Sequence, residues 1–90
     1  MDKKKAFEIL KNHGHENIVF IEKDANYFLD KHSHDFNVDI IIISGTFEIE
    51  LSNSNIILFP GSRLKLNKDE VHSEKAGSEG VSFLSARPTV

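Results

Sequence analysis

Two histidines, His32 and His34, stand one residue apart in the stretch DKHSHDFNVDIIIISG, directly before a run of isoleucine. On a β-strand, side chains two positions apart emerge from the same face, with their Cα atoms roughly 6.5–7 Å apart. Two imidazoles placed in this way can converge on one metal ion, with metal–nitrogen distances of about 2.0–2.2 Å. The alternative interpretation is a pair of exposed histidines near the end of a strand.

The composition is that of one ordinary globular domain of 90 residues, 39% hydrophobic and 28% charged. Its net charge of −3 argues against nucleic acid as a partner. Without cysteine, the chain can form neither disulfides nor thiolate metal sites. No apolar run reaches the ~20 residues that span a bilayer, and Glu8, Lys11 and Asn12 interrupt any signal-peptide core. We therefore expect a cytoplasmic protein with no membrane partner.

The elements that position the histidines divide into a helical lead-in, residues 1–16, and a single β-domain, residues 17–90. Asp2 can cap a helix from about Lys3 to His13, and Gly14 suits the left-handed conformation that often follows a helix. Beyond it, eight short β-rich runs are separated by turn residues, among them Gly45 and the stretch AGSEG. This pattern predicts an all-β sandwich, jelly roll or barrel.

The isoleucine run VDIIIIS is apolar on both faces, which is typical of a central strand covered on two sides. The second cover is either the other sheet or a partner subunit. Neighbouring runs alternate instead: Leu64 and Leu66 are expected inside, with Arg63 outside. Because the isoleucine strand and the amphipathic first helix offer more apolar surface than a lone small barrel can cover, we expect a homodimer.

Three histidines and two glycines resemble the two sequence motifs of the cupin superfamily. The first motif is H-x-H, three or four residues, Glu, and about six residues to Gly; His32, His34 and Gly45 fit it. The second is Gly, five residues, P-x-G, two residues and His, which Gly61 and His72 fit. In it, Asn67 and Asp69 replace the usual Pro and Gly, and both residue types still favour a turn.

The resemblance covers roughly residues 25–87, and the closing HSEKAGSEGVSFLSARP is similar to very small single-domain cupins of the RmlC-like kind. It implies a small cupin-type jelly-roll β-barrel, here preceded by the short N-terminal helix. It also implies metal binding by His32, His34 and His72.

The fourth ligand departs from the family pattern. Val38 occupies the usual glutamate position, while Asp39 fits the longer spacer and is the first candidate. Adjacent strand residues point to opposite faces, so only one of the two can look into the barrel. The remaining candidates are Asp30, Asp35, Asn37 or water.

A three-histidine site without cysteine suits one divalent transition metal: Zn, Fe, Ni, Cu or Mn. Three protein ligands leave positions open for water or substrate, as in catalytic sites. Glu74 lies two positions after His72 and is expected on the same strand face. Three interpretations are open for it: a catalytic acid or base, a residue that orients an imidazole, or a surface carboxylate.

Other polar and aromatic residues have plainer interpretations. Arg87 either steers an anionic ligand or is a solvated charge, and His13 and His15 are expected at the surface. Core or pocket-wall positions are expected for Tyr27, Phe28, Phe36 and Phe83.

The leading functional hypothesis is a small metal-binding cupin that holds a small molecule at the barrel mouth, as a metal-dependent oxygenase, isomerase or lyase. The alternatives are a non-catalytic small-molecule or metal sensor, and a metal-free degenerate cupin that acts in assembly. The fold itself does not name a reaction.

Overall fold

The computed structural model describes residues 1–88, so the last two residues of the expected β-domain lie outside the described chain. The chain begins with helix α1, Lys3–Asn12. Asp2 caps it, because its carboxylate accepts a hydrogen bond from the Lys4 backbone N–H at 3.0 Å. His13 ends the helix, and Gly14 follows with φ +88°. The predicted helix is therefore confirmed to within one residue.

Six strands follow, and all pair antiparallel. They are β1 (Asn17–Lys23), β2 (Phe28–His32), β3 (Val38–Leu51), β4 (Asn55–Leu58), β5 (Arg63–Leu66) and β6 (His72–Arg87). The eight short runs expected from the sequence are wrong in number, because β3 and β6 each join two of them. Gly45 was expected to be a turn; instead it bends β3 without ending it.

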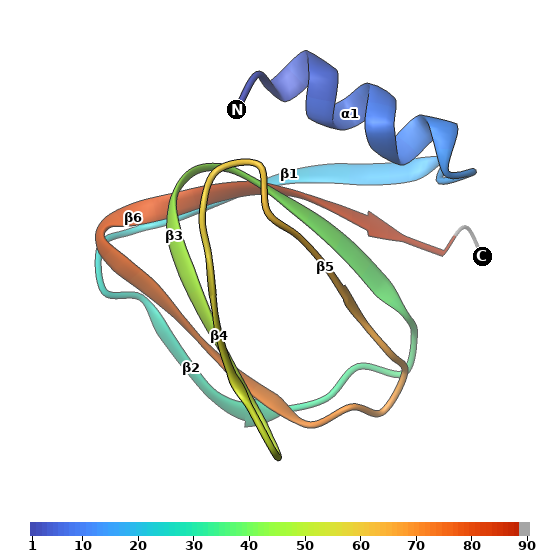
Figure 1. Ribbon diagram of the computed structural model, residues 1–90. Helices are drawn as coiled ribbons and strands as arrows, with labels where there is room; N and C mark the ends of the chain where they lie inside the picture. Colours follow the sequence, from blue (N-terminus) through green and yellow to red (C-terminus); the bar gives the residue numbers. More distant parts are fainter. Residues whose placement is uncertain (89–90) are drawn as a thin grey trace.

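The two long strands each serve two layers. The first layer has the order β1–β6–β3–β5 and uses residues 81–87 of β6, and the second has the order β2–β6–β3–β4 and uses residues 72–76. The strands curve around a common interior, with α1 outside it (Figure 1). The predicted all-β barrel with a short N-terminal helix is confirmed.

Glycine permits the bend between the layers. Gly45 has φ +73° and Gly80 has φ +79°, a region that L-residues with a side chain rarely adopt. A Cβ atom at position 45 would collide with the backbone carbonyl of Gly80. The two long strands therefore approach backbone to backbone at the bend, and their far ends form the opposite, open end of the barrel.

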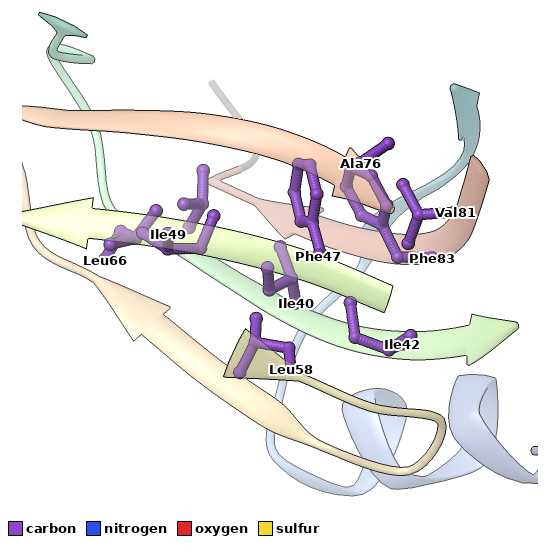
Figure 2. Close-up of a cluster of buried hydrophobic side chains, with 10 residues drawn as sticks. Ile40, Ile42, Phe47, Ile49, Leu58, Leu66, Ala76, Val81 and Phe83 are labelled. Carbon is purple, nitrogen blue, oxygen red and sulfur yellow. The ribbon is translucent and has the colours of Figure 1, made fainter. Parts of the chain in front are cut away.

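The barrel interior holds a cluster of buried hydrophobic side chains contributed by both layers (Figure 2). Phe47 and Phe83 stack in it with ring centroids 5.0 Å apart. The other buried members of this cluster are Val38, Ile40, Ile42, Ile49, Leu58, Leu66, Ala76 and Val81. The inward positions predicted for Leu64 and Leu66 are confirmed: Leu66 is buried in this cluster and Leu64 packs against it.

A second cluster lies on the outer face of the first layer. There Ile41 packs with Leu84 and Ala86 against Ala6 and Leu10 of α1. The isoleucine strand is thus covered twice, as expected, but its second cover is the chain's own helix. That face no longer argues for a partner subunit. In residues 1–88 no helix is both long enough and apolar enough to cross a membrane.

Candidate metal centre

Three histidines meet at the open end of the barrel. His32 is the last residue of β2 and His72 the first of β6, where their Cα atoms are register partners. His34 lies in the loop after β2 rather than on the strand that the H-x-H spacing predicted. The structure still brings them together, since one ring nitrogen of each lies within 4.8 Å of the others. The ring centroids of His32 and His72 are 4.3 Å apart.

Hydrogen bonds orient two of the three rings. His32 Nδ1 lies 2.7 Å from the carbonyl oxygen of Asp30, and His72 Nδ1 lies 3.0 Å from that of Glu70. A carbonyl only accepts, so each Nδ1 carries a proton, and in the neutral ring each Nε2 then keeps its lone pair. Both Nε2 atoms are buried and have no hydrogen-bond partner among residues 1–88. A buried acceptor left alone costs about 1–3 kcal/mol, which a cation between the rings would offset.

The surroundings of the third ring favour its neutral form. Burial lowers the pKa of His34, and the neighbouring imidazoles of His32 and His72 lower it further. The charge of Glu74 acts in the opposite direction, while that of Arg87 again lowers the pKa. A neutral imidazole is the form that binds a metal ion. The donor set and its protonation therefore fit a transition metal.

A cavity of about 250 Å³ extends from the histidines between the two layers. His34 and His72 line it, together with aromatic and aliphatic side chains, among them Phe36, Val38 and Phe83. The expectation that Tyr27, Phe36 and Phe83 form the pocket wall is confirmed, whereas Phe28 is 59% exposed and belongs to neither core nor wall. The cavity therefore offers a small, mainly apolar chamber next to the imidazoles of His34 and His72.

Glu74 also lines this cavity, on the face of β6 that carries His72. Its carboxylate accepts a hydrogen bond from the Tyr27 hydroxyl at 3.3 Å. Burial raises the pKa of Tyr27, and the charge and hydrogen bond of Glu74 raise it further. A catalytic role for Glu74 stays a prediction, but its inward position agrees with one.

Asp39, the first candidate for the fourth ligand, points the other way. Val38 and Ile40 face the interior, so residue 39 faces outward. There its carboxylate accepts hydrogen bonds from Arg63 Nε at 2.9 Å and Nη2 at 2.6 Å, and from His15 Nε2 at 2.9 Å. The structure therefore corrects the assignment of Asp39 to the metal site.

The other side chains proposed as fourth ligand are engaged elsewhere or lie apart. The Asp30 carboxylate accepts a hydrogen bond from the Lys31 backbone N–H at 2.7 Å. The Asn37 side-chain oxygen accepts one from the Lys68 backbone N–H at 2.6 Å. Asp35 lines a separate surface pocket. Within residues 1–88 the cluster holds three histidines and no carboxylate, which leaves water as the candidate from the original set.

Burial pulls the pKa of Asp39 upward, but the hydrogen bonds and charges of Arg63 and His15 outweigh it and hold that pKa below its usual value. His15 was expected at the surface and is instead half-buried against Asp39, while His13 is exposed and accepts from Arg63 at 3.1 Å. Sequence reasoning missed this cluster. Its only signal was a charged residue inside an otherwise apolar strand.

Comparisons with known proteins rest on structure alone, since no family model matches the sequence and no curated protein does either. A cupin-2 domain protein from Shewanella frigidimarina NCIMB 400 superposes with a TM-score of 0.69 at 20% identity, over 80% of this chain and 69% of the other. An RmlC-like cupin from the same organism gives 0.68 at 17%, over 80% and 65%.

The chain has the cupin fold. One chain described under "Crystal structures of DMSP lyases RdDddP and RnDddQII" also superposes, with a TM-score of 0.72 at 15% identity, over 81% of this chain and 38% of the other. At these identities the cupin likeness describes architecture and leaves the reaction to be argued from the site.

The turn before His72 shows how this cupin barrel keeps its site despite the altered second motif. Asp69, which replaces the usual glycine, adopts φ +65°, a conformation that Asp tolerates better than most residues. Its backbone N–H donates to the carbonyl of His34 at 2.8 Å. The turn thus ties the loop that carries His34 to the start of β6, and so positions two of the three imidazoles.

Proposed function

We propose that this cupin-fold protein binds one divalent transition metal through His32, His34 and His72 and holds a small molecule in the adjoining cavity. The observation that carries the proposal is the pair of buried Nε2 atoms of His32 and His72. The Nδ1–H···O=C bond of each ring makes Nε2 the acceptor of the neutral imidazole, and each Nε2 lacks a partner among residues 1–88.

The donor set narrows the ion to those that imidazole suits, among them Zn, Fe, Ni and Cu, with Mn as the weakest candidate. When bound, such an ion supplies Lewis-acid activation of a ligand oxygen or lowers the pKa of a coordinated water. Glu74, on the same strand face as His72, is the group in the cavity placed to accept or return a proton. The Tyr27 hydroxyl holds that carboxylate in position.

The catalytic form of the proposal is a metal-dependent enzyme of oxygenase, isomerase or lyase type. It is supported by the open three-histidine donor set, by Glu74 in the same cavity, and by the fold likeness to DMSP lyases. The apolar wall of Phe36, Val38 and Phe83 would exclude bulk water from a bound ligand.

A second candidate is a non-catalytic cupin that binds a metal or a small molecule. Val38 favours it, because an apolar side chain, 8% exposed, occupies the position where the cupin motif usually carries a carboxylate ligand. Turnover of a substrate separates the two candidates.

The test is elemental analysis of protein purified without a histidine tag, next to the His32→Ala/His34→Ala double variant. We expect about one transition-metal ion per chain, lost in the double variant. The matched control is His13→Ala, which removes a histidine outside the cluster and should keep the ion. Equal metal content in wild type and double variant after anaerobic reconstitution would overturn the proposal.

A further inference from the structure

Arg87 places a cation in the same cavity as the histidines. Strand alternation puts Phe83, Ser85 and Arg87 on the face of β6 that looks into the barrel, and all three line the cavity. Lys23 lines it as well, but its Nζ lies 4.6 Å from the ring centroid of Tyr27. The Lys23 ammonium is thus engaged with the Tyr27 ring, and Arg87 is the cation of the cavity that remains to bind a ligand.

The guanidinium of Arg87 makes no ion pair within residues 1–88. Its Nε is buried and has no hydrogen-bond partner among residues 1–88, and no carboxylate of those residues lies within ion-pair distance. Arg63 shows the contrast, because two of its nitrogens donate to Asp39 at 2.9 and 2.6 Å. Buried donors without a partner are rare in folded proteins, and each calls for an acceptor.

The chemistry of the wall decides which acceptor fits. A guanidinium binds carboxylate or phosphate through two parallel hydrogen bonds. The cavity, about 250 Å³, is small and largely apolar, which suits a short carbon chain. Glu74 also faces it, and its carboxylate would repel a doubly charged anion more strongly than a singly charged one.

We propose that Arg87 binds the carboxylate of a small organic acid in this cavity, with the hydrocarbon part against the aromatic wall. The proposal rests on the proposed function in that the same ligand would then reach the histidines. The buried hydroxyl of Ser85, two residues earlier on the same face, is the second donor available to the carboxylate.

The experiment is a ¹H–¹⁵N NMR titration of the chelator-treated protein with propanoate, propanamide and inorganic phosphate, following backbone amides and the Arg87 Nε–H signal. We expect propanoate to shift residues 83–87 and the Nε–H. Propanamide has the same shape without the charge and should bind at least about tenfold more weakly. Arg87→Gln should weaken propanoate binding by a similar factor, and the control Lys65→Gln, an exposed strand cation, should leave it unchanged.

The proposal is overturned when propanamide binds as well as propanoate, when Arg87→Gln binds propanoate like wild type, or when no probe shifts the cavity residues. Tighter binding of phosphate than of propanoate also overturns it and identifies a phosphate site. The spectrum of Arg87→Gln shows directly whether that variant is folded.

The proposed metal site is tested apart from the anion. Elemental analysis of Arg87→Gln should show wild-type metal content, because Arg87 is not among the donors. The single variant His32→Ala removes a proposed metal donor that does not line the cavity, and it should still bind propanoate through Arg87. If wild type binds propanoate but no metal, the metal proposal fails alone. If it binds metal but no propanoate, the anion proposal fails alone.

Discussion

The imidazoles of His32 and His72 sit opposite each other across the β2–β6 pair, with ring centroids 4.3 Å apart, and each is held by the carbonyl two residues before it. The two strands therefore present the same tautomer from both sides. In the neutral rings, the two Nε2 lone pairs face one space and form a site for a cation.

Metal binding should stabilise the fold, because the unfolded chain lacks the site. At a hundredfold excess of free ion over Kd, the free energy of unfolding of wild type should rise by about 2.7 kcal/mol. His34→Ala should lose most of this gain; His34 is only half-buried, so the variant should fold. Thermal unfolding followed by circular dichroism, with Zn²⁺, Ni²⁺ or chelator, measures the effect. A melting temperature of wild type that no ion raises contradicts the prediction.

The Tyr27–Glu74 hydrogen bond can be read by absorbance, since Tyr27 is the single tyrosine and the chain has no tryptophan. Burial and the Glu74 charge raise its pKa, so the phenol should ionise above its usual value of 10.0. Glu74→Gln removes the charge and should lower that pKa, leaving the part that burial contributes. The measurement is a titration at 295 nm, with Glu79→Gln as the control. An unchanged Tyr27 titration in Glu74→Gln means that the contact does not form in solution.

Asp39 should be important for stability and not for metal binding. Asp39→Asn weakens the hydrogen bonds from Arg63 and His15 and should cost about 2 kcal/mol in urea unfolding at pH 7. The pKa of Asp39 is lowered by folding, so its contribution is present above the ordinary value of 3.8 and is lost as pH falls through the folded value. The variant should therefore lose less stability than wild type below that pH.

The surface residue Asp35 provides the control for this experiment. Asp35→Asn should change the free energy of unfolding by less than about 0.5 kcal/mol. If Asp39→Asn also lost its bound metal while remaining folded, the correction of the ligand set would itself be wrong.

Gly45 and Gly61 separate two physical reasons for a glycine: a positive φ angle and the close approach of another backbone segment. Both have positive φ, at +73° and +90°, so alanine at either position costs about 1–2 kcal/mol in backbone strain. Only position 45 adds a collision with the Gly80 backbone, whereas nothing lies within 4 Å of a Cβ at position 61. Gly45→Ala should thus lose about 3 kcal/mol or more. Equal losses in urea unfolding would argue against a close approach of β3 and β6.

Ile41 tests what covers the isoleucine strand. It is 1% exposed beneath α1, so Ile41→Glu buries a charge without a partner and should prevent folding, while Ile41→Val should cost about 0.5–1.5 kcal/mol. The homodimer stays a prediction, now without the support of this face. Light scattering of wild type measures the oligomeric state directly. The same measurement on the folded variant Ile41→Val tests the face: a changed oligomeric state would mean that this face takes part in a subunit interface.

The parts of the site that the sequence predicts are those fixed by local spacing. The positions of His32, His34 and His72 within two motifs predict their convergence, because strand pairing brings motif to motif. The face of residue 39 was not predictable in the same way. Alternation allows either Val38 or Asp39 inside, and only the packing of Val38 into the core decides between them.

Long-range partners and bends escaped prediction for a related reason. A glycine with positive φ marks a turn and a strand bend alike, so Gly45 and Gly80 read as strand ends. The pairing of His15 with Asp39 depends on where α1 docks, which no local pattern states. Arg87 appeared as a terminal charge, and its buried Nε became visible only once β6 had been placed between β1 and β3.

The long strand β6 also determines when the site can exist during folding. It pairs with β1 at Asn17–Arg87, with β2 at His32–His72 and with most of β3, so most contacts of the barrel join residues far apart in the sequence. Such high contact order slows folding, typically to milliseconds or longer. His72 and Arg87 are the first and last residues of this strand. Both proposed sites therefore depend on β6 being paired along its whole length, and a partly folded chain has neither of them complete. Ligands of either kind would act late in folding, by slowing unfolding rather than by speeding collapse.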